Sequence, residues 1–314
     1  MMTNKENVRN FRTTIGGQAL IEGILMLGPQ KAAIVVNTPG GHRVKEMQVK
    51  RVKDRFPVLG LPLIRGMFNF FDSLRIGIGA LMYSTDFLDE GDDKGKVEQW
   101  LENKFSKEKA DKIVIGFALA LGILLPIGLF ILLPTLVAGL LGGVIGSGIL
   151  RNLLEGALRI LIFLIYLVLV SRMDEMRRVF AYHGAEHKSI SCYEAREELT
   201  VENVRKHPRQ HPRCGTSFLF VVMIISILVF SFVKWSNPVI RMLMRLALLP
   251  LVVGISYEIN RFAGRYDNLL TKILRAPGMW LQNLTTREPD DSMIEVAIDA
   301  LTRVIPDQEG LDRW

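Results

Sequence analysis

Long uncharged apolar runs limit the folds open to this 314-residue chain more than any other feature. The longest, from Ile113 to about Leu141, exceeds the roughly 20 residues that a helix needs to cross a bilayer. Three further apolar runs lie at about 153–170, 218–233 and 242–257. We therefore expect four transmembrane helices, two within 113–170 and two within 218–257.

Four spans would place both chain ends and the segment 171–217 on the same side of a membrane. That side has many basic residues beside the spans, among them Lys104, Lys112, Arg172 and Arg177. Because basic residues concentrate in cytoplasmic loops, this side is predicted to be cytoplasmic. The net charge of +7 then reflects topology and attraction to anionic lipids. We expect membrane lipids as partners, and no nucleic acid.

The N-terminal segment, 1–56, is predicted to be β-rich. An apolar stretch meets a turn cluster at 37–41, and a partly alternating apolar pattern follows it, as in a hairpin. Glycines bracket a second apolar run over 19–27. Residues 57–112 are expected to form an amphipathic helix that lies on the membrane, re-enters it or spans it, followed by a highly charged linker.

The C-terminal tail, 258–314, is predicted to be soluble and helical. Ser292 and Glu295 have the spacing of a capping box, and an apolar stripe follows them. Within the predicted spans, Glu155 and Arg159 are four residues apart and are expected to pair with each other, while Arg245 lies at the start of the last span. With so few charges inside the spans, a transporter is disfavoured.

Four of the five histidines and both cysteines lie between residues 182 and 214. His183 and His187 are four residues apart, so on a helix their imidazoles project from one face and suit one metal ion. Glu186 between them completes an H-x-x-E-H pattern, in which the glutamate acts as a base on a metal-bound water. We therefore predict that Glu186 is catalytic and that the two histidines are metal ligands.

A second group, His207, His211 and Cys214, could supply further ligands. A proline follows each of these histidines, which disfavours helix and places the group on a loop. Mixed His and Cys ligands favour zinc, with another divalent transition metal as the alternative. The site is either catalytic or structural, and the competing interpretation is a basic surface loop that binds lipid headgroups. Cys192 is a nucleophile, a further ligand or an inert thiol, and cytosolic thiols should be reduced.

Three blocks of the chain resemble the YqhQ-type bacterial membrane proteins, a family of unknown function that is often labelled a predicted metal-dependent enzyme. The first is Gly16 to Gly23 with Gly28-Pro29. The second runs from Tyr182 through Cys214 to Ser217. The third runs from Pro277-Gly278 to Leu284-Thr285-Thr286-Arg287-Glu288-Pro289. The resemblance implies a multi-pass protein of the bacterial cell membrane with both termini cytoplasmic.

The same resemblance implies that 1–56, 171–217 and 258–314 assemble into one domain, with Thr285, Thr286 and Glu288 as candidates for lining its cleft. The predicted fold is therefore mixed: an α-helical membrane protein with about four transmembrane helices plus a cytosolic α+β domain built from these three segments.

Two functions follow. The first is a zinc-dependent hydrolase that acts at the membrane surface, with Glu186 as general base, on a peptide, a lipid headgroup or a phosphoester. The second is a non-enzymatic assembly or quality-control factor that docks onto a protein translocation channel or a membrane protease, with the His/Cys cluster purely structural. The sequence leaves the substrate open, and also whether the protein forms a homo-oligomer.

Overall fold

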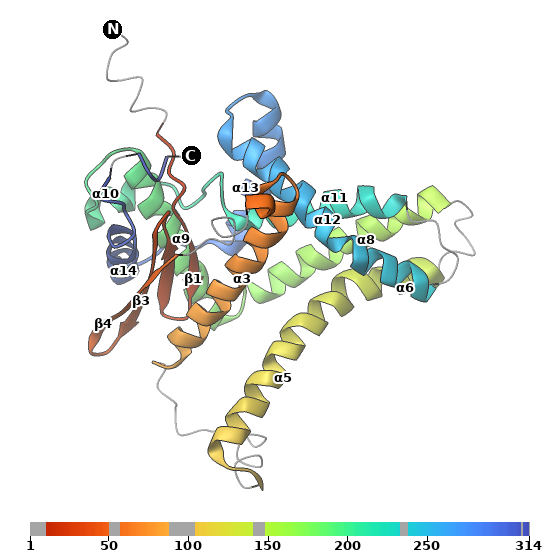
Figure 1. Ribbon diagram of the computed structural model, residues 1–314, viewed down its shortest axis with the longest axis horizontal. Helices are drawn as coiled ribbons and strands as arrows, with labels where there is room; N and C mark the ends of the chain where they lie inside the picture. The colour runs from red at the N-terminus through yellow and green to blue at the C-terminus, as the bar shows by residue number, and fades with distance from the viewer. Residues whose placement is uncertain are drawn as a thin grey trace. The chain divides into compact units, whose positions relative to one another are not determined.

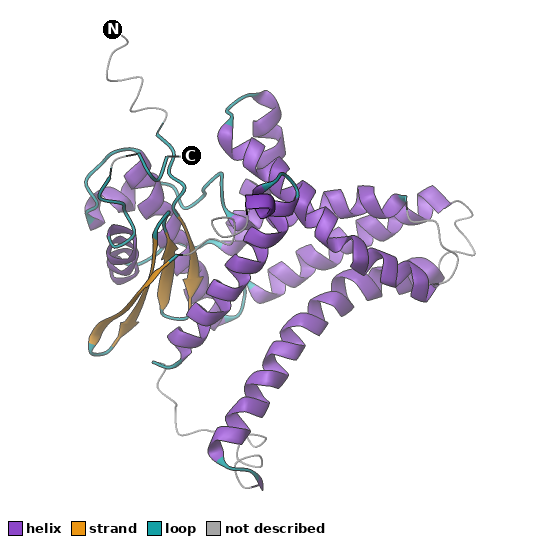
Figure 2. Cartoon of the chain, in the orientation of Figure 1, coloured by secondary structure: helices purple, strands orange, loops and turns teal. Residues whose placement is uncertain are grey.

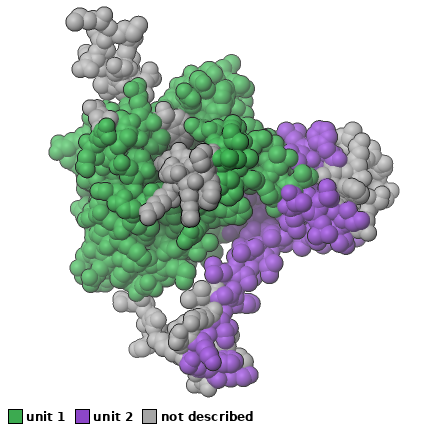
Figure 3. All heavy atoms as spheres, viewed as in Figure 1, with its two compact units in different colours: residues 1–87, 167–226, 248–314 green, residues 88–166, 227–247 purple. Residues whose placement is uncertain are grey.

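A computed structural model describes residues 11–49, 57–87, 104–140, 148–232, 238–308 and 310–313. The described chain is mostly helical and has one sheet near the N-terminus (Figure 2). It divides into two compact units (Figure 3). Unit 1 comprises 1–87, 167–226 and 248–314, and unit 2 comprises 88–166 and 227–247.

The sheet of unit 1 has four antiparallel strands in sequential order (Figure 1). These are β1 (Gly16–Leu20), β2 (Gly23–Leu27), β3 (Lys31–Thr38) and β4 (Gly41–Gln48). The hairpin predicted around 37–41 is confirmed as β3 and β4, with Thr38 paired to Gly41. The apolar run over 19–27 is divided between two strands, because the chain turns at Glu22, whose φ of 52° lies in the left-handed region.

Helices cover both faces of the sheet. On one face α9 (Asp174–Glu194) and α14 (Asp291–Thr302) share a core with alternate residues of the strands, including Ile24, Met26 and Val35. On the other face α3 (Ile64–Thr85) packs its Ala80 against Leu20 and its sheet neighbours. The N-terminal segment, the His/Cys segment and the C-terminal tail therefore share one core.

Four further helices that belong wholly or partly to unit 1 follow α9 in the sequence. Two are α10 (Val201–Lys206) and α13 (Leu269–Thr285), and unit 1 also contains parts of α11 (Gly215–Ser231) and α12 (Pro238–Arg265). The helix predicted after residue 57 is confirmed as α3, preceded by the short turn η1 (Pro57–Gly60). It approaches α12 closely, because a Cβ at Gly66 would lie 2.7 Å from the Cβ of Tyr257.

The tail helix begins earlier than predicted. Asp290 is its N-cap, and the Asp290 carboxylate accepts the backbone N–H of Met293 at 2.9 Å. The capping box expected at Ser292 and Glu295 is therefore wrong by two residues. The Ser292 hydroxyl donates to Asp290 instead. Asp is as good a cap as Ser, so composition alone did not separate the two.

Unit 2 is helical throughout its described part. It contains α5 (Lys107–Ile127), the π-helical turn η2 (Gly128–Leu132), α6 (Leu133–Leu140) and most of α8 (Gly148–Val170). This π turn lies between Pro126 and Pro134, and prolines inside a helix commonly distort it. The charged linker predicted before the first span, and thus before α5, lies largely outside the described residues.

Three described helices are long and apolar enough to cross a membrane: Gly116–Leu140, Asn152–Val170 and Met242–Arg265. The first has no buried residue in its apolar window. The remaining predicted span, at 218–233, corresponds to α11, an apolar helix of 17 described residues. At about 1.5 Å per residue it is slightly shorter than the hydrocarbon core of a typical bilayer.

A buried ion cluster in unit 2 contains the predicted pair of Glu155 and Arg159 and is larger than predicted. Glu155 is bound by the guanidinium of Arg245 through both carboxylate oxygens, and it accepts the Thr135 hydroxyl at 2.8 Å. Arg159, the predicted partner, lies farther away at 3.4 Å. Arg245 is only 2% exposed, so it joins Glu155 and Arg159 as a third buried charge. The sequence had placed Arg245 only at the start of the last span.

Candidate metal centre

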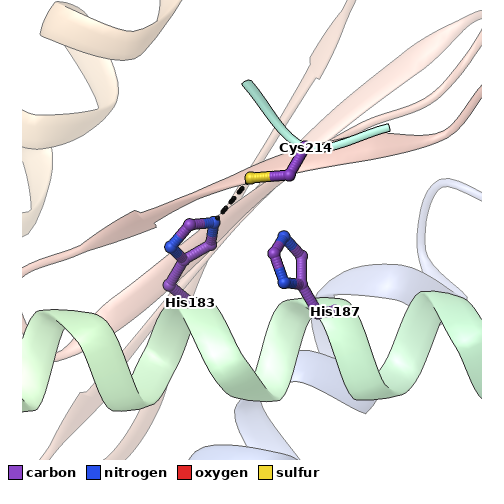
Figure 4. Close-up of side chains that lie close together, drawn as sticks. All are labelled: His183, His187 and Cys214. Carbon is purple, nitrogen blue, oxygen red and sulfur yellow. Dashed lines mark hydrogen bonds between the residues drawn. The ribbon is translucent and has the colours of Figure 1, made fainter. Parts of the chain in front are cut away.

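Helix α9 brings His183 and His187 onto one face, where both rings point toward Cys214 (Figure 4). The Nε2 atom of His183 lies 3.2 Å from the Sγ atom of Cys214. One donor atom from each of the three residues falls within 4.8 Å of the other two. This is the spacing expected of ligands that share a small metal ion.

Both imidazoles are held by their other nitrogen. His183 Nδ1 lies 2.8 Å from the Thr285 carbonyl oxygen, and His187 Nδ1 lies 2.6 Å from the Arg209 carbonyl oxygen. A carbonyl only accepts, so each Nδ1 carries the proton. The Nε2 atom is then the position on each ring that can bind a metal ion once it carries no proton. Backbone partners of this kind fix the ring orientation and tautomer of metal-binding histidines.

Gly184 explains how the Thr285 carbonyl comes so close. A Cβ at Gly184 would lie 2.1 Å from the Arg287 carbonyl oxygen, so the segment after α13 runs directly along α9 at this point. The Arg287 amide also donates to the Phe180 carbonyl at 2.8 Å. The glycine that weakens a helix in sequence terms is therefore required by this approach.

Gln282 fixes the loop that carries Cys214. Its fully buried side chain accepts the His211 amide at 2.7 Å and donates to the His211 carbonyl at 2.9 Å. Cys214 itself lies at the last position before α11. The loop is thus tied to α13 three residues before the thiol, which limits where the sulfur can lie.

Glu186 lies beside the three ligands. Its Oε2 atom is 3.9 Å from His183 Nε2 and 4.0 Å from His187 Nε2. Burial raises the pKa of this carboxyl, while the two imidazoles and the backbone N–H of Gly17 oppose that rise. A Cβ at Gly17 would lie 2.9 Å from the Glu186 side chain, so only glycine leaves room for it. A raised pKa makes a carboxylate a stronger base, which suits a group that accepts a proton from water.

His183 and Cys214 form a coupled pair. Burial opposes charge on His183, but Cys214, Glu186 and the Thr285 carbonyl together outweigh burial and raise the pKa of His183 to about 9. Burial also opposes charge on Cys214, yet the imidazoles hold the pKa of this thiol well below its usual range. A bound metal ion would replace the proton that lies between His183 Nε2 and Cys214 Sγ.

A cavity of about 380 Å³ opens onto this group. Its wall includes the three donor residues and Glu186, the chain from Thr14 to Ala19, and the start of α11 as far as Leu219. A ligand set with three protein donors and an adjoining cavity leaves room for a further ligand, as catalytic zinc sites do.

Two predicted ligands lie outside this group. The ring of His211 lies 5.6 Å from that of His187, but its Nε2 lies 3.5 Å from a Glu194 carboxylate oxygen. Burial lowers the pKa of His211. His207 lies 3.1 Å from Glu197, and these two form a second cluster of metal-binding side chains with Cys192. In that cluster burial raises the pKa of Cys192 to about 11.

The C-terminal segment, expected to line the cleft, instead orients His183 through the Thr285 carbonyl. The hydroxyls of Thr285 and Thr286 donate to carbonyls of their own helix, and Glu288 pairs with Lys188 at 2.9 Å. None of these three side chains lines the described cavity. The positioning groups missed by sequence reasoning are mainly main-chain carbonyls, which carry no residue-type signal. Gln282 is the exception, since a buried glutamine next to an apolar stripe could have been noticed.

These features define a class of protein: a mostly helical chain with three helices apolar enough to cross a membrane and a buried His/His/Cys group beside a carboxylate. The chain belongs to the family described as "Protein of unknown function (DUF1385)", which matches residues 61–307. It is 31% identical over 296 residues to the "Uncharacterized protein YqhQ" of Bacillus subtilis (strain 168), covering 92% of each chain. No solved structure matches it.

Proposed function

We propose that this protein is a metal-dependent hydrolase, with His183, His187 and Cys214 as ligands of a zinc ion and Glu186 as general base. The observation that carries the proposal is the orientation of the histidines. Both Nδ1 atoms face carbonyl oxygens, and both rings point toward the Cys214 sulfur, beside a cavity. Another divalent transition metal suits the same donors less well than zinc.

The chemistry follows from the donors. A zinc ion at such a centre lowers the pKa of a coordinated water towards neutrality. Glu186, whose pKa is raised by burial, takes the proton of the attacking water and passes it to the leaving group. The cavity admits the substrate, and the buried walls around Glu186 limit competing solvent.

We further infer that the protein crosses the bacterial cell membrane four times, with both termini cytoplasmic. The three long apolar helices and the apolar α11 support this, as do the basic residues that flank the spans. The centre would then lie on the cytosolic face, where thiols such as Cys214 stay reduced and able to bind metal.

The test is elemental analysis of the purified full chain together with spectroscopy after cobalt substitution. We expect about one ion bound by the main centre, and a near-ultraviolet thiolate-to-cobalt band that Cys214→Ser abolishes. His183→Ala/His187→Ala should lose the ion, whereas the matched control His207→Ala, in the second cluster, should keep it. A wild-type chain without stoichiometric metal would contradict the proposal.

Glu186→Gln separates catalysis from structure. We expect it to retain the metal and lose about 10²–10⁴-fold of the hydrolytic rate, measured on a panel of fluorogenic peptides, esters and phosphoesters. If the cluster is instead only a structural element of an assembly factor that docks onto a translocation channel or membrane protease, Glu186→Gln will be silent and ligand loss will only destabilise the domain. The cavity beside the ligands favours the hydrolase.

A further inference from the structure

We propose that the substrate of this centre is an extended polypeptide that binds by adding a strand to the outer edge of β1. The inference rests on the proposed hydrolase and names its substrate class. It starts from the sheet order, because β1 is an edge strand whose partner within the described residues is β2 alone. The same strand, from Gly16 to Ala19, forms one wall of the cavity at the metal centre.

The direction of the backbone groups shows which of them face the cavity. The N–H of Gly17 lies beside the Glu186 carboxylate, on α9, so it does not point toward β2. In an antiparallel strand the N–H and C=O of one residue point to the same side, and the next residue points to the other. Gly17 and Ala19 therefore direct their remaining main-chain groups outward, whereas Gly16, Gln18 and Leu20 pair with β2.

These outward groups are available to a ligand. Among the described residues, no hydrogen-bond partner meets the carbonyl of Gly17 or the N–H and carbonyl of Ala19 on the cavity side. The strand is also accessible, since Gly17 and Gln18 are exposed. A row of unsatisfied donors and acceptors at a sheet edge is a template for a further strand.

A lipid headgroup or a small phosphoester could accept the Ala19 N–H, but it lacks the alternating donors and acceptors that pair with the whole edge. An extended peptide would use all of them, and its backbone would pass within reach of Glu186 because Gly17 touches both the docking edge and this carboxylate. The glycine thus serves two purposes. It leaves room for the Glu186 side chain, and it lets a second backbone approach the strand closely.

The reaction is hydrolysis of one peptide bond. Water adds its oxygen to the acyl carbon while one proton passes to Glu186. The C–N bond breaks, and Glu186 returns the proton to the leaving amine. The products are one carboxylic acid and one amine, so no oxidant or reductant is needed.

Hydroxamates separate the docking edge from the metal centre. With the zinc-loaded full chain in detergent, acetohydroxamate reports the metal alone, and peptidyl hydroxamates of one, two and three residues report the edge. We expect affinity to rise with each added residue that pairs with β1. N-methylation should weaken the three-residue compound by about threefold to tenfold at alternate residues only, because every second N–H of a strand faces its partner.

A variant tests the protein side of the same contact. Ala19→Pro removes one outward N–H but leaves the pairing of β1 with β2, since proline is tolerated where the N–H faces away from the ladder. It should bind the three-residue hydroxamate about threefold to tenfold more weakly than wild type, at equal zinc content. Ala19→Ser, which keeps the amide proton, controls for the change of side chain.

The outcomes are distinguishable. If the zinc-loaded wild-type chain does not bind acetohydroxamate, the proposal of a metal hydrolase is itself overturned. Normal acetohydroxamate binding with no gain from peptide length, or with equal effects of N-methylation at neighbouring residues, would overturn only the docking edge. The N-methyl series uses the wild-type chain, so it decides the question even if Ala19→Pro does not fold.

Discussion

The two buried polar clusters of this chain, one in each unit, are organised in opposite ways. In unit 2 the polar groups point at one another, because Arg245 and Thr135 both donate hydrogen bonds to Glu155. The adjoining cavity, about 10 Å³, is barely large enough for a single water molecule. In unit 1 the donor atoms of His183, His187 and Cys214 point at a common centre beside a cavity of about 380 Å³.

The difference separates a structural cluster from a functional one. Groups that satisfy each other contribute to the fold and leave nothing for a ligand. In unit 1 the protein instead satisfies the outer nitrogens of both imidazoles with backbone carbonyls, which holds the inner nitrogens ready to bind. Substitutions should therefore change stability in one cluster and ligand binding in the other.

The largest stability effect is expected in unit 2. Glu155→Leu leaves the guanidinium of Arg245 buried without its carboxylate, and we expect a loss of about 3–5 kcal/mol in the free energy of unfolding. The measurement is the unfolding transition in detergent, with metal content as the second readout, which should not change. Glu155→Leu/Arg245→Met should recover part of the loss. Equal losses in the single and double variants would show that the cluster is not a coupled unit.

The local part of both clusters could be predicted from the sequence, and the long-range part could not. The pairing of His183 with His187 follows from helix geometry, and the structure confirms that they share one face. The same local rule holds for Arg159, which pairs with Glu155 at 3.4 Å, but it missed the main partner, Arg245, which comes from a different helix. Spacing within one helix says nothing about a residue far away in the sequence.

The choice among the loop residues was also beyond the sequence. His207, His211 and Cys214 were equivalent candidates, yet only Cys214 joins the two histidines of α9. The choice is made by the hydrogen bonds from Gln282 to the backbone of His211. Such bonds depend on tertiary packing and not on a residue pattern. The sheet was easier, because turn glycines and alternating apolar residues mark a hairpin locally.

A smaller effect is expected at this support. Gln282→Leu leaves the buried N–H of His211 without a partner among the described residues. It also removes one of two hydrogen bonds to the His211 carbonyl, the other coming from the Cys214 N–H at 3.3 Å. These losses should loosen the loop and lower zinc affinity by about 10–100-fold. The matched control is Gln210→Leu on the same loop, whose half-buried side chain bonds only Asn283 among the described residues. Competition with a chelating dye measures the affinity. An unchanged affinity in Gln282→Leu would show that the loop is fixed by other contacts.

The smallest expected effect for a single step is that of one pH unit, and it should appear only in unit 1. With its pKa raised to about 9, His183 carries a proton at neutral pH that zinc must displace. Cys214, whose pKa is lowered, has already lost its proton. Zinc affinity should therefore rise by about tenfold per pH unit from about pH 7 and level off near pH 9.

Chelator competition at several pH values, corrected for the chelator's own protons, gives the slope. A slope near two would mean that Cys214 remains a thiol in the metal-free protein, and a slope of zero would mean that His183 is already neutral. Either result would contradict the thiolate–imidazolium pair. His207→Ala is the matched control and should give the same slope as wild type, because His207 belongs to the other cluster.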